Sequence, residues 1–155
     1  MPTVQGYKKL NTTIKTIIRL SQKYDVNVSF LNFENQGGAY HYQTDTIEIS
    51  HDYEKRRTAC LGIFFHELGH SHCHKNRLWK DYHIRKPIYG KKKIDHFMSI
   101  SFRVENWVDR WAEKEMRKNF KSLKFCPSYR TKEHKEWLHN YYTEFFKWRK
   151  EAYGK

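Results

Sequence analysis

The residues best suited to chemistry lie close together, in the segment His66-Glu67-Leu68-Gly69-His70. His66 and His70 are four residues apart, so on a helix their side chains project from one face at successive turns. At that spacing both imidazoles can bind one Zn²⁺ ion. Glu67 follows the first histidine, where its carboxylate can take a proton from an attacking water and pass it to a leaving amine. The pattern predicts a site for metal-assisted peptide hydrolysis, with a solvated histidine-rich helix as the alternative.

A catalytic zinc ion needs a third protein ligand and an open position. His74 repeats the four-residue spacing, but on a straight helix it lies about 12 Å from His66 along the axis, too far for three turns to share one ion. Glu105 is the ligand that we favour, because Asp109 follows it by one turn on the same face of a strongly helical segment. Asp109 would accept the free N–H of a ligand histidine and fix its tautomer. A solvated acidic pair is the alternative for these two carboxylates.

Other residues compete for roles at this site. His83 and His96 lie in or near the irregular, basic segment 78–93, and either can serve as the third ligand in place of a carboxylate if that loop folds back. Hydrolysis also needs a donor for the tetrahedral oxyanion. Location alone makes Tyr82, His83 and Tyr89 the candidate donors, and all three stay open.

The segments before the motif predict one helix and a small sheet. Asn11 or Thr12 can cap a first helix, which carries apolar residues at helical spacing. Val26–Phe33 alternates with period two and predicts a strand. Two further short strands are expected at Ala39–Gln43 and Thr46–Ser50, separated by turns. Together they predict an antiparallel three-stranded meander.

The remainder of the chain predicts helices. Lys55–Asn76 carries the histidine motif, and Ser101–Phe120, with its first residue as a plausible cap, carries the two carboxylates. A final helix at 131–153 has an aromatic stripe that favours core packing. The predicted fold class is α+β, with the small sheet packed on the motif helix and on further helices. We expect a single domain over residues 1–155, with its core at about 11–120.

Composition and charge narrow the class of protein. The chain has 155 residues, 38% of them hydrophobic and 17% aromatic, which favours a folded domain over a disordered chain. No apolar run approaches the length of a membrane span, and no signal peptide is visible, so we expect no membrane association and a cytoplasmic, intracellular location. The three cysteines show no paired spacing, which argues against a disulfide framework or a Cys-x-x-Cys zinc site. The net charge of +13 favours an anionic partner, with nucleic acid bound through a basic surface as one possibility.

The order of the motifs resembles a known family. An Ile-x-Ile strand (Ile47-Glu48-Ile49) precedes His-Glu-Leu-Gly-His, and His74 follows four residues after the second histidine. A helix with Glu105-x-x-x-Asp109 comes next and continues into Trp111-Ala112. Over about residues 11–116, this arrangement resembles the ImmA/IrrE-type zinc peptidases, which are gluzincin-like.

The resemblance implies a zincin-like minimal metallopeptidase domain with one Zn²⁺ per chain. In that family pattern His66, His70 and Glu105 hold the ion and Glu67 is the catalytic base. The substrate would be a protein or peptide, cut selectively as a regulatory step. An extended substrate could pair with the strand at 39–43 if that strand lies at an edge of the sheet, although an ordinary solvated edge is an equal alternative.

Two other functions compete with this one. A SprT-like protease that cuts DNA-bound proteins would use a histidine, such as His83 or His96, as the third ligand. A basic nucleic-acid-binding or partner-binding module would keep a zinc site without catalysis. The ligand set of the metal separates the two protease readings.

Overall fold

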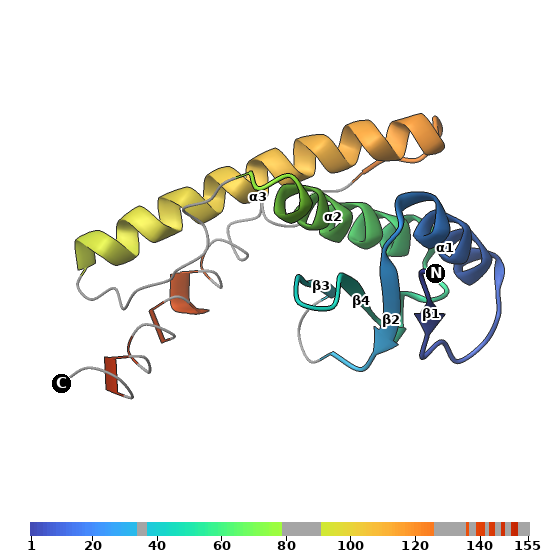
Figure 1. Cartoon of the computed structure of the whole chain (residues 1–155), viewed down its shortest axis with the longest axis horizontal. Coiled ribbons are helices and arrows are strands. Elements are labelled where there is room, and N and C mark those ends of the chain that lie inside the picture. Colours follow the sequence, from blue (N-terminus) through green and yellow to red (C-terminus); the bar gives the residue numbers. More distant parts are fainter. Residues whose placement is uncertain are drawn as a thin grey trace. The chain divides into compact units, whose positions relative to one another are not determined.

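The computed structural model describes residues 1–33, 37–78 and 91–125, together with separate residues between 136 and 151. The chain divides into two compact units (Figure 1). The first unit comprises Met1–Asn76 and Val108–Cys126, and the second comprises Arg77–Trp107 and Pro127–Lys155. The expectation of one domain over the whole chain stays a prediction.

The first unit contains a sheet and the helices that cover it. Its elements are β1 (Val4–Gln5), α1 (Thr12–Tyr24), β2 (Asn27–Leu31), β3 (Gly38–His41), β4 (Thr46–Ser50), the 3₁₀-helix η1 (His51–Tyr53) and α2 (Arg57–Lys75). Helix α3 (Lys91–Asn119) begins in the second unit, and its last turns, from Val108, belong to the first. The predicted class, α+β, is confirmed.

The predicted antiparallel three-stranded meander is wrong, because the sheet has four strands and is mixed. Its order is β1-β2-β4-β3, with β1 and β4 each parallel to β2, and β3 antiparallel to β4. After β2 the chain forms β3, and β4 then lies between these two strands. In β4, Ile49 is the partner of Phe30 on β2, and Ile47 is the partner of Tyr40 on β3. Alternating apolar residues show which face of a strand is buried, but they do not name its neighbours. Within the part of the chain that the structure describes, this order makes β3 an edge strand.

One face of the sheet packs against α1 and α2. Helix α1 contacts β1 and β2, while α2 contacts β3 and β4, and both helices lie on the same side of the sheet in Figure 1. The apolar side chains of this layer are almost fully buried: Ile14, Ile17, Leu20, Val28, Phe30, Ile47, Ile49, Leu61, Phe64 and Phe65. Each contributes about 1.5–3 kcal/mol relative to an exposed position. This core fixes α2 above the sheet.

The start of α1 confirms its predicted cap. The Asn11 side-chain oxygen accepts a hydrogen bond from the Ile14 N–H at 2.9 Å, which satisfies one of the free donors of the first turn. The helix ends at Tyr24, and the next residue, Asp25, caps it with a left-handed φ of 52°. Helix α1 thereby leads directly into β2.

Two predicted helices have different bounds in the structure. Helix α2 begins at Arg57, close to the predicted start, whereas α3 begins ten residues before Ser101, the predicted cap. Ser101 is therefore an interior helix residue, and it is buried. No Pro or Gly stands between Lys91 and Ser101, so the helix can begin as early as Lys91. The predicted final helix at 131–153 falls mostly outside the described residues.

None of the helices in the described ranges offers the long apolar stretch that a membrane crossing requires.

Candidate metal centre

Helix α2 brings together the three residues of the histidine motif. The ligand atoms of His66, Glu67 and His70 all lie within 4.8 Å of one another. Among the described residues, no other group of three His, Cys, Asp or Glu side chains comes so close. This part of the chain can therefore hold a metal ion.

The two histidines are spaced as ligands of one ion would be. Their Nε2 atoms are 3.3 Å apart, and their rings meet edge to face with centroids separated by 5.0 Å. Two nitrogens, each about 2.0–2.1 Å from a tetrahedral zinc ion, are separated by about 3.3–3.4 Å. The separation of His66 and His70 fits that requirement.

A buried carboxylate orients the first histidine. Asp109 Oδ1 lies 2.7 Å from His66 Nδ1, and Asp109 is only 1% exposed. Because an ionised carboxylate only accepts, Nδ1 must carry the proton, and Nε2 is left with its lone pair directed toward His70. The sequence predicts this contact between Asp109 and a motif histidine. Its effect on a bound metal stays a prediction.

A glycine allows α3 to approach α2 closely enough for that contact. A Cβ atom on Gly69 would lie 2.8 Å from Val108 Cγ1 and 3.2 Å from the Val108 carbonyl oxygen. Any larger residue would push these two helices apart. Because Asp109 follows Val108, the close contact at Gly69 sets how far the carboxylate reaches toward His66.

A second glycine seats the edge strand against the motif. A Cβ atom on Gly38 would lie 2.5 Å from Ile63 Cγ2, 2.7 Å from the Glu48 carbonyl oxygen and 3.5 Å from Glu67 Cγ. Gly38 begins β3, so the edge of the sheet passes directly beside Glu67. Glu67 is only 9% exposed, which leaves its carboxylate in a restricted environment.

An aspartate fixes the other end of β3 to the end of α2. Asp45 Oδ1 accepts hydrogen bonds from the Ser71 and Tyr40 hydroxyls, each at 3.0 Å, and Asp45 Oδ2 pairs with Lys75 at 2.6 Å. Burial, followed by the hydrogen bond to the carboxylate, raises the pKa of Tyr40 to about 12. The strand and the helix are thus held together on both sides of the motif.

The two remaining histidines of α2 pack against aromatic rings. His74 lies near Tyr40 and Tyr42, with ring centroids 6.3 and 5.4 Å away. His72 stacks on Trp111 at 4.9 Å, and its burial lowers its pKa. Neither belongs to the group that can hold a metal.

Sequence reasoning missed Gly38, Gly69 and Asp45, which position the group without touching it. A glycine in a helix or at the start of a strand is only a weak signal of close approach. Nothing in the sequence pairs Asp45 with Ser71, because the turn and the helix are distant along the chain.

Other predicted site residues lie elsewhere in the chain. Glu105 is on α3, four residues before Asp109, in the second unit, and its role as the third ligand stays a prediction. His96 is exposed on the same helix. The candidates Tyr82, His83 and Tyr89 lie outside the described residues.

No family model matches this chain, and no curated protein and no solved structure is significantly similar to it. The resemblance to the ImmA/IrrE-type peptidases therefore rests on the quoted motifs alone.

Proposed function

We propose that this protein is a zinc-dependent metallopeptidase that hydrolyses peptide bonds in a protein substrate. The observation that carries the proposal is the group formed by His66, Glu67 and His70, whose ligand atoms lie within 4.8 Å of one another. Two histidine nitrogens at a ligand-like separation, with a glutamate beside them, supply two of the ligands and the general base of a hydrolytic zinc site. Selective, regulatory cleavage is the form of activity that the motif resemblance implies.

His66 and His70 would hold the ion, with Glu105 as the third ligand. The carboxylate of Asp109 keeps His66 in the tautomer that a ligand needs. When bound, Zn²⁺ would lower the pKa of a water molecule and polarise the scissile carbonyl.

Glu67 is the general base in this proposal. Its side chain is nearly buried and lies beside both histidines. A carboxylate in that position can take a proton from the attacking water and deliver it to the leaving amine.

The edge strand β3 is suited to hold the substrate. Among the described strands it pairs only with β4, on one side, and its first residue, Gly38, lies against Glu67. An extended peptide that adds to this edge would gain backbone hydrogen bonds and would bring its carbonyl groups past the motif. The strand therefore supplies alignment, while α2 supplies the chemistry.

Metal analysis of variants tests the ligands. The purified protein should bind about one Zn²⁺ per chain, and His70→Ala and Glu105→Ala should each lose it. His74→Ala is the matched control, because this histidine repeats the spacing yet packs on tyrosines, so it should retain zinc. Full zinc retention in Glu105→Ala would remove Glu105 from the site.

A Glu67→Gln variant tests the chemistry separately. It should keep zinc and lose peptide hydrolysis, because an amide cannot accept the proton of the attacking water. A library of unstructured peptides, read by mass spectrometry, can report cleavage without a known substrate. Undiminished cleavage by Glu67→Gln would end the general-base assignment.

A further inference from the structure

Two basic stripes on the first unit form a surface that the proposed peptidase does not use. Each stripe has three cations at four-residue spacing, so each repeats about every 6 Å along its helix. The six residues are Lys15, Arg19 and Lys23 on α1, and Arg110, Lys114 and Lys118 on α3. All six are exposed, and we call them the basic surface.

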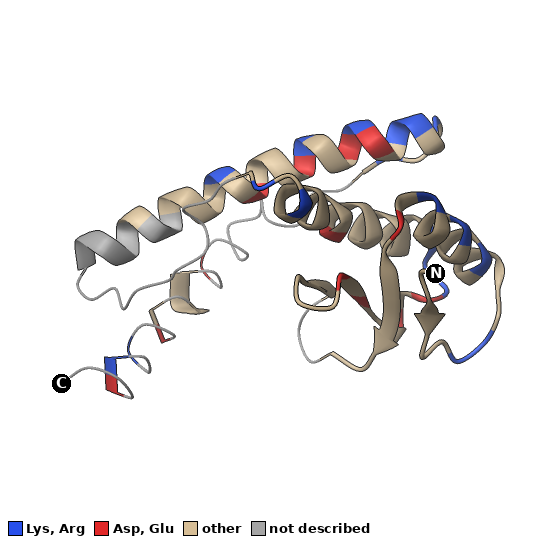
Figure 2. Ribbon diagram, viewed as in Figure 1, with Lys and Arg blue, Asp and Glu red and all other residues tan. Residues whose placement is uncertain are grey.

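The two stripes meet where α1 ends beside the last turns of α3. Lys23 Nζ lies 2.6 Å from Asn119 Oδ1, and the Tyr24 hydroxyl donates to Glu115 at 2.9 Å. Lys118 pairs with Glu115 at 2.8 Å. Figure 2 shows Lys and Arg along α1 and along the last turns of α3. The contacts make the two stripes parts of one surface.

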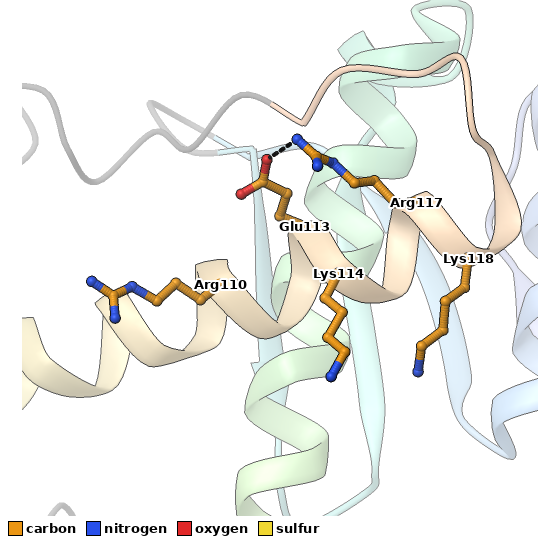
Figure 3. Close-up of a pocket in the computed structure, with 5 residues that line it drawn as sticks. All are labelled: Arg110, Glu113, Lys114, Arg117 and Lys118. Atoms are coloured by element: carbon orange, nitrogen blue, oxygen red, sulfur yellow. Dashed lines mark hydrogen bonds and ion pairs between the residues drawn. The ribbon is translucent and has the colours of Figure 1, made fainter.

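Little negative charge offsets this surface. Helix α1 contains no Asp or Glu. Within the described residues, no carboxylate forms an ion pair with the cations of α1 or with Arg110 and Lys114. Figure 3 shows Glu113 paired with Arg117 at 2.8 Å, while Lys114 and Lys118 extend on the other side of α3. Glu115, on the same turns of α3, pairs with Lys118. The surface therefore keeps most of its positive charge.

The shape of the surface favours an extended anionic partner. An open depression of about 380 Å³ lies on this surface, and the five residues that line it all come from α3. Such a depression does not enclose a small anion or a peptide side chain. None of the exposed large apolar side chains among the described residues lies on α1 or α3, so the surface lacks the groups that insert into a membrane.

We infer that the basic surface binds the phosphate backbone of nucleic acid. Phosphates are regularly repeated charges on the outside of the polymer, so exposed Lys and Arg side chains on convex helices can reach them without a pocket. An acidic protein partner would instead be expected to bury apolar or aromatic anchors, which this surface does not offer. Recognition is through charge and does not select a base sequence.

The test measures binding of the full chain to a labelled random-sequence DNA duplex by fluorescence anisotropy at several salt concentrations. We expect a dissociation constant of roughly 10⁻⁴–10⁻⁶ M near physiological salt, weakening steeply as salt rises. The variant Lys15→Gln/Arg19→Gln/Lys23→Gln should reduce the slope of log K against log salt by about 2–3, because three phosphate contacts are lost.

A matched variant separates this surface from net charge alone. Lys8→Gln/Lys55→Gln/Arg103→Gln also removes three exposed cations, outside the basic surface, and should keep nearly the full slope. The proposal would be overturned if the two triple variants reduced the slope of log K against log salt equally. It would also be overturned if the protein did not bind the duplex at low salt.

Two more measurements complete the test. Arg110→Gln/Lys114→Gln should reduce the slope by about 2, which probes the α3 stripe independently of any folding defect in the α1 variant. Polyglutamate at equal charge concentration should compete poorly with the duplex. If polyglutamate competed as strongly as unlabelled DNA, the proposal would be overturned, and an acidic protein would be the better candidate for the partner.

Discussion

The candidate metal site and the basic surface lie in the same unit and use charge in opposite ways. We call the candidate metal site, which is His66, Glu67 and His70 with Asp109 behind His66, the metal group. At the metal group the charged side chains are few and buried: Asp109 is 1% exposed and Glu67 9%. On the basic surface all six cations are exposed, and one of them, Lys118, has an ion-pair partner among the described residues. The first region depends on atomic positions, whereas the second depends on the sum of charges and on their screening by salt. Substitutions should therefore have specific effects at the first and additive effects at the second.

The largest effect that separates the two regions is expected for Asp109→Asn. Without the carboxylate, His66 loses the partner that fixes its tautomer, so zinc affinity should fall about 10–100-fold. Competition with a chromophoric zinc chelator measures the change. Glu113→Gln is the control, because Glu113 lies one turn further along α3 and pairs with Arg117 at the surface. Equal zinc affinities for wild type and Asp109→Asn would show that this carboxylate does not support the ion.

A smaller effect is expected from crowding the helix contact beside the metal group. In Gly69→Ala the new methyl group meets Val108 Cγ1 at 2.8 Å, which should lower the free energy of unfolding by about 1–3 kcal/mol, less a gain of about 1 kcal/mol in helix propensity. Urea denaturation measures the net loss. Adding Val108→Ala should recover part of it, because the nearest clashing atom is removed. A double variant no more stable than Gly69→Ala would place the strain elsewhere.

The smallest expected effect is the pH dependence of stability that comes from one tyrosine in each region. Burial is the main cause that raises the pKa values of Tyr40, near the metal group, and Tyr24, beneath the basic surface, from 10.0 to about 12. Because both folded-state values are raised, the stability that these tyrosines contribute is complete below pH 10 and is lost as the pH rises through 12. Ultraviolet titration of tyrosinate should show a late component in the folded protein.

Single substitutions assign that component. Tyr24→Phe and Tyr40→Phe should each remove about one tyrosine from it, and the loss of stability between pH 10 and 12 should be shallower in each variant. A late component that neither substitution reduces would contradict the assignment of these two groups.

The helices and the site residues on them were accessible from the sequence because the information is local. The spacing of His66 and His70 specifies one helix face, and the Asn11 cap specifies where α1 begins. The predicted start of α3 lies ten residues too late because Ser101 resembles a cap, although no helix-breaking residue stands between Lys91 and Ser101. Local signals of this kind predict that a helix exists more reliably than where it ends.

The sheet order was not accessible, and neither were the contacts that seat the motif. The alternation in β2 and β4 shows that each strand has a buried face. It does not show that β4 pairs in parallel with β2 after the chain has formed β3 in between. The roles of Gly38 and Gly69 likewise depend on atoms of Ile63 and Val108 that approach from other elements.

By itself, the sequence determined the candidate metal-binding residues on α2: His66 and His70 lie one turn apart on one face, with Glu67 next to the first, because helical spacing converts order along the chain into position on a face. It also determined the excess of positive charge. Only the tertiary structure decided that Asp109 reaches His66, that the edge of β3 passes beside Glu67, and that the cations of α1 and α3 join in one surface. Such pairings depend on packing between elements distant in sequence, and packing is set by the shapes of all the side chains in the core together.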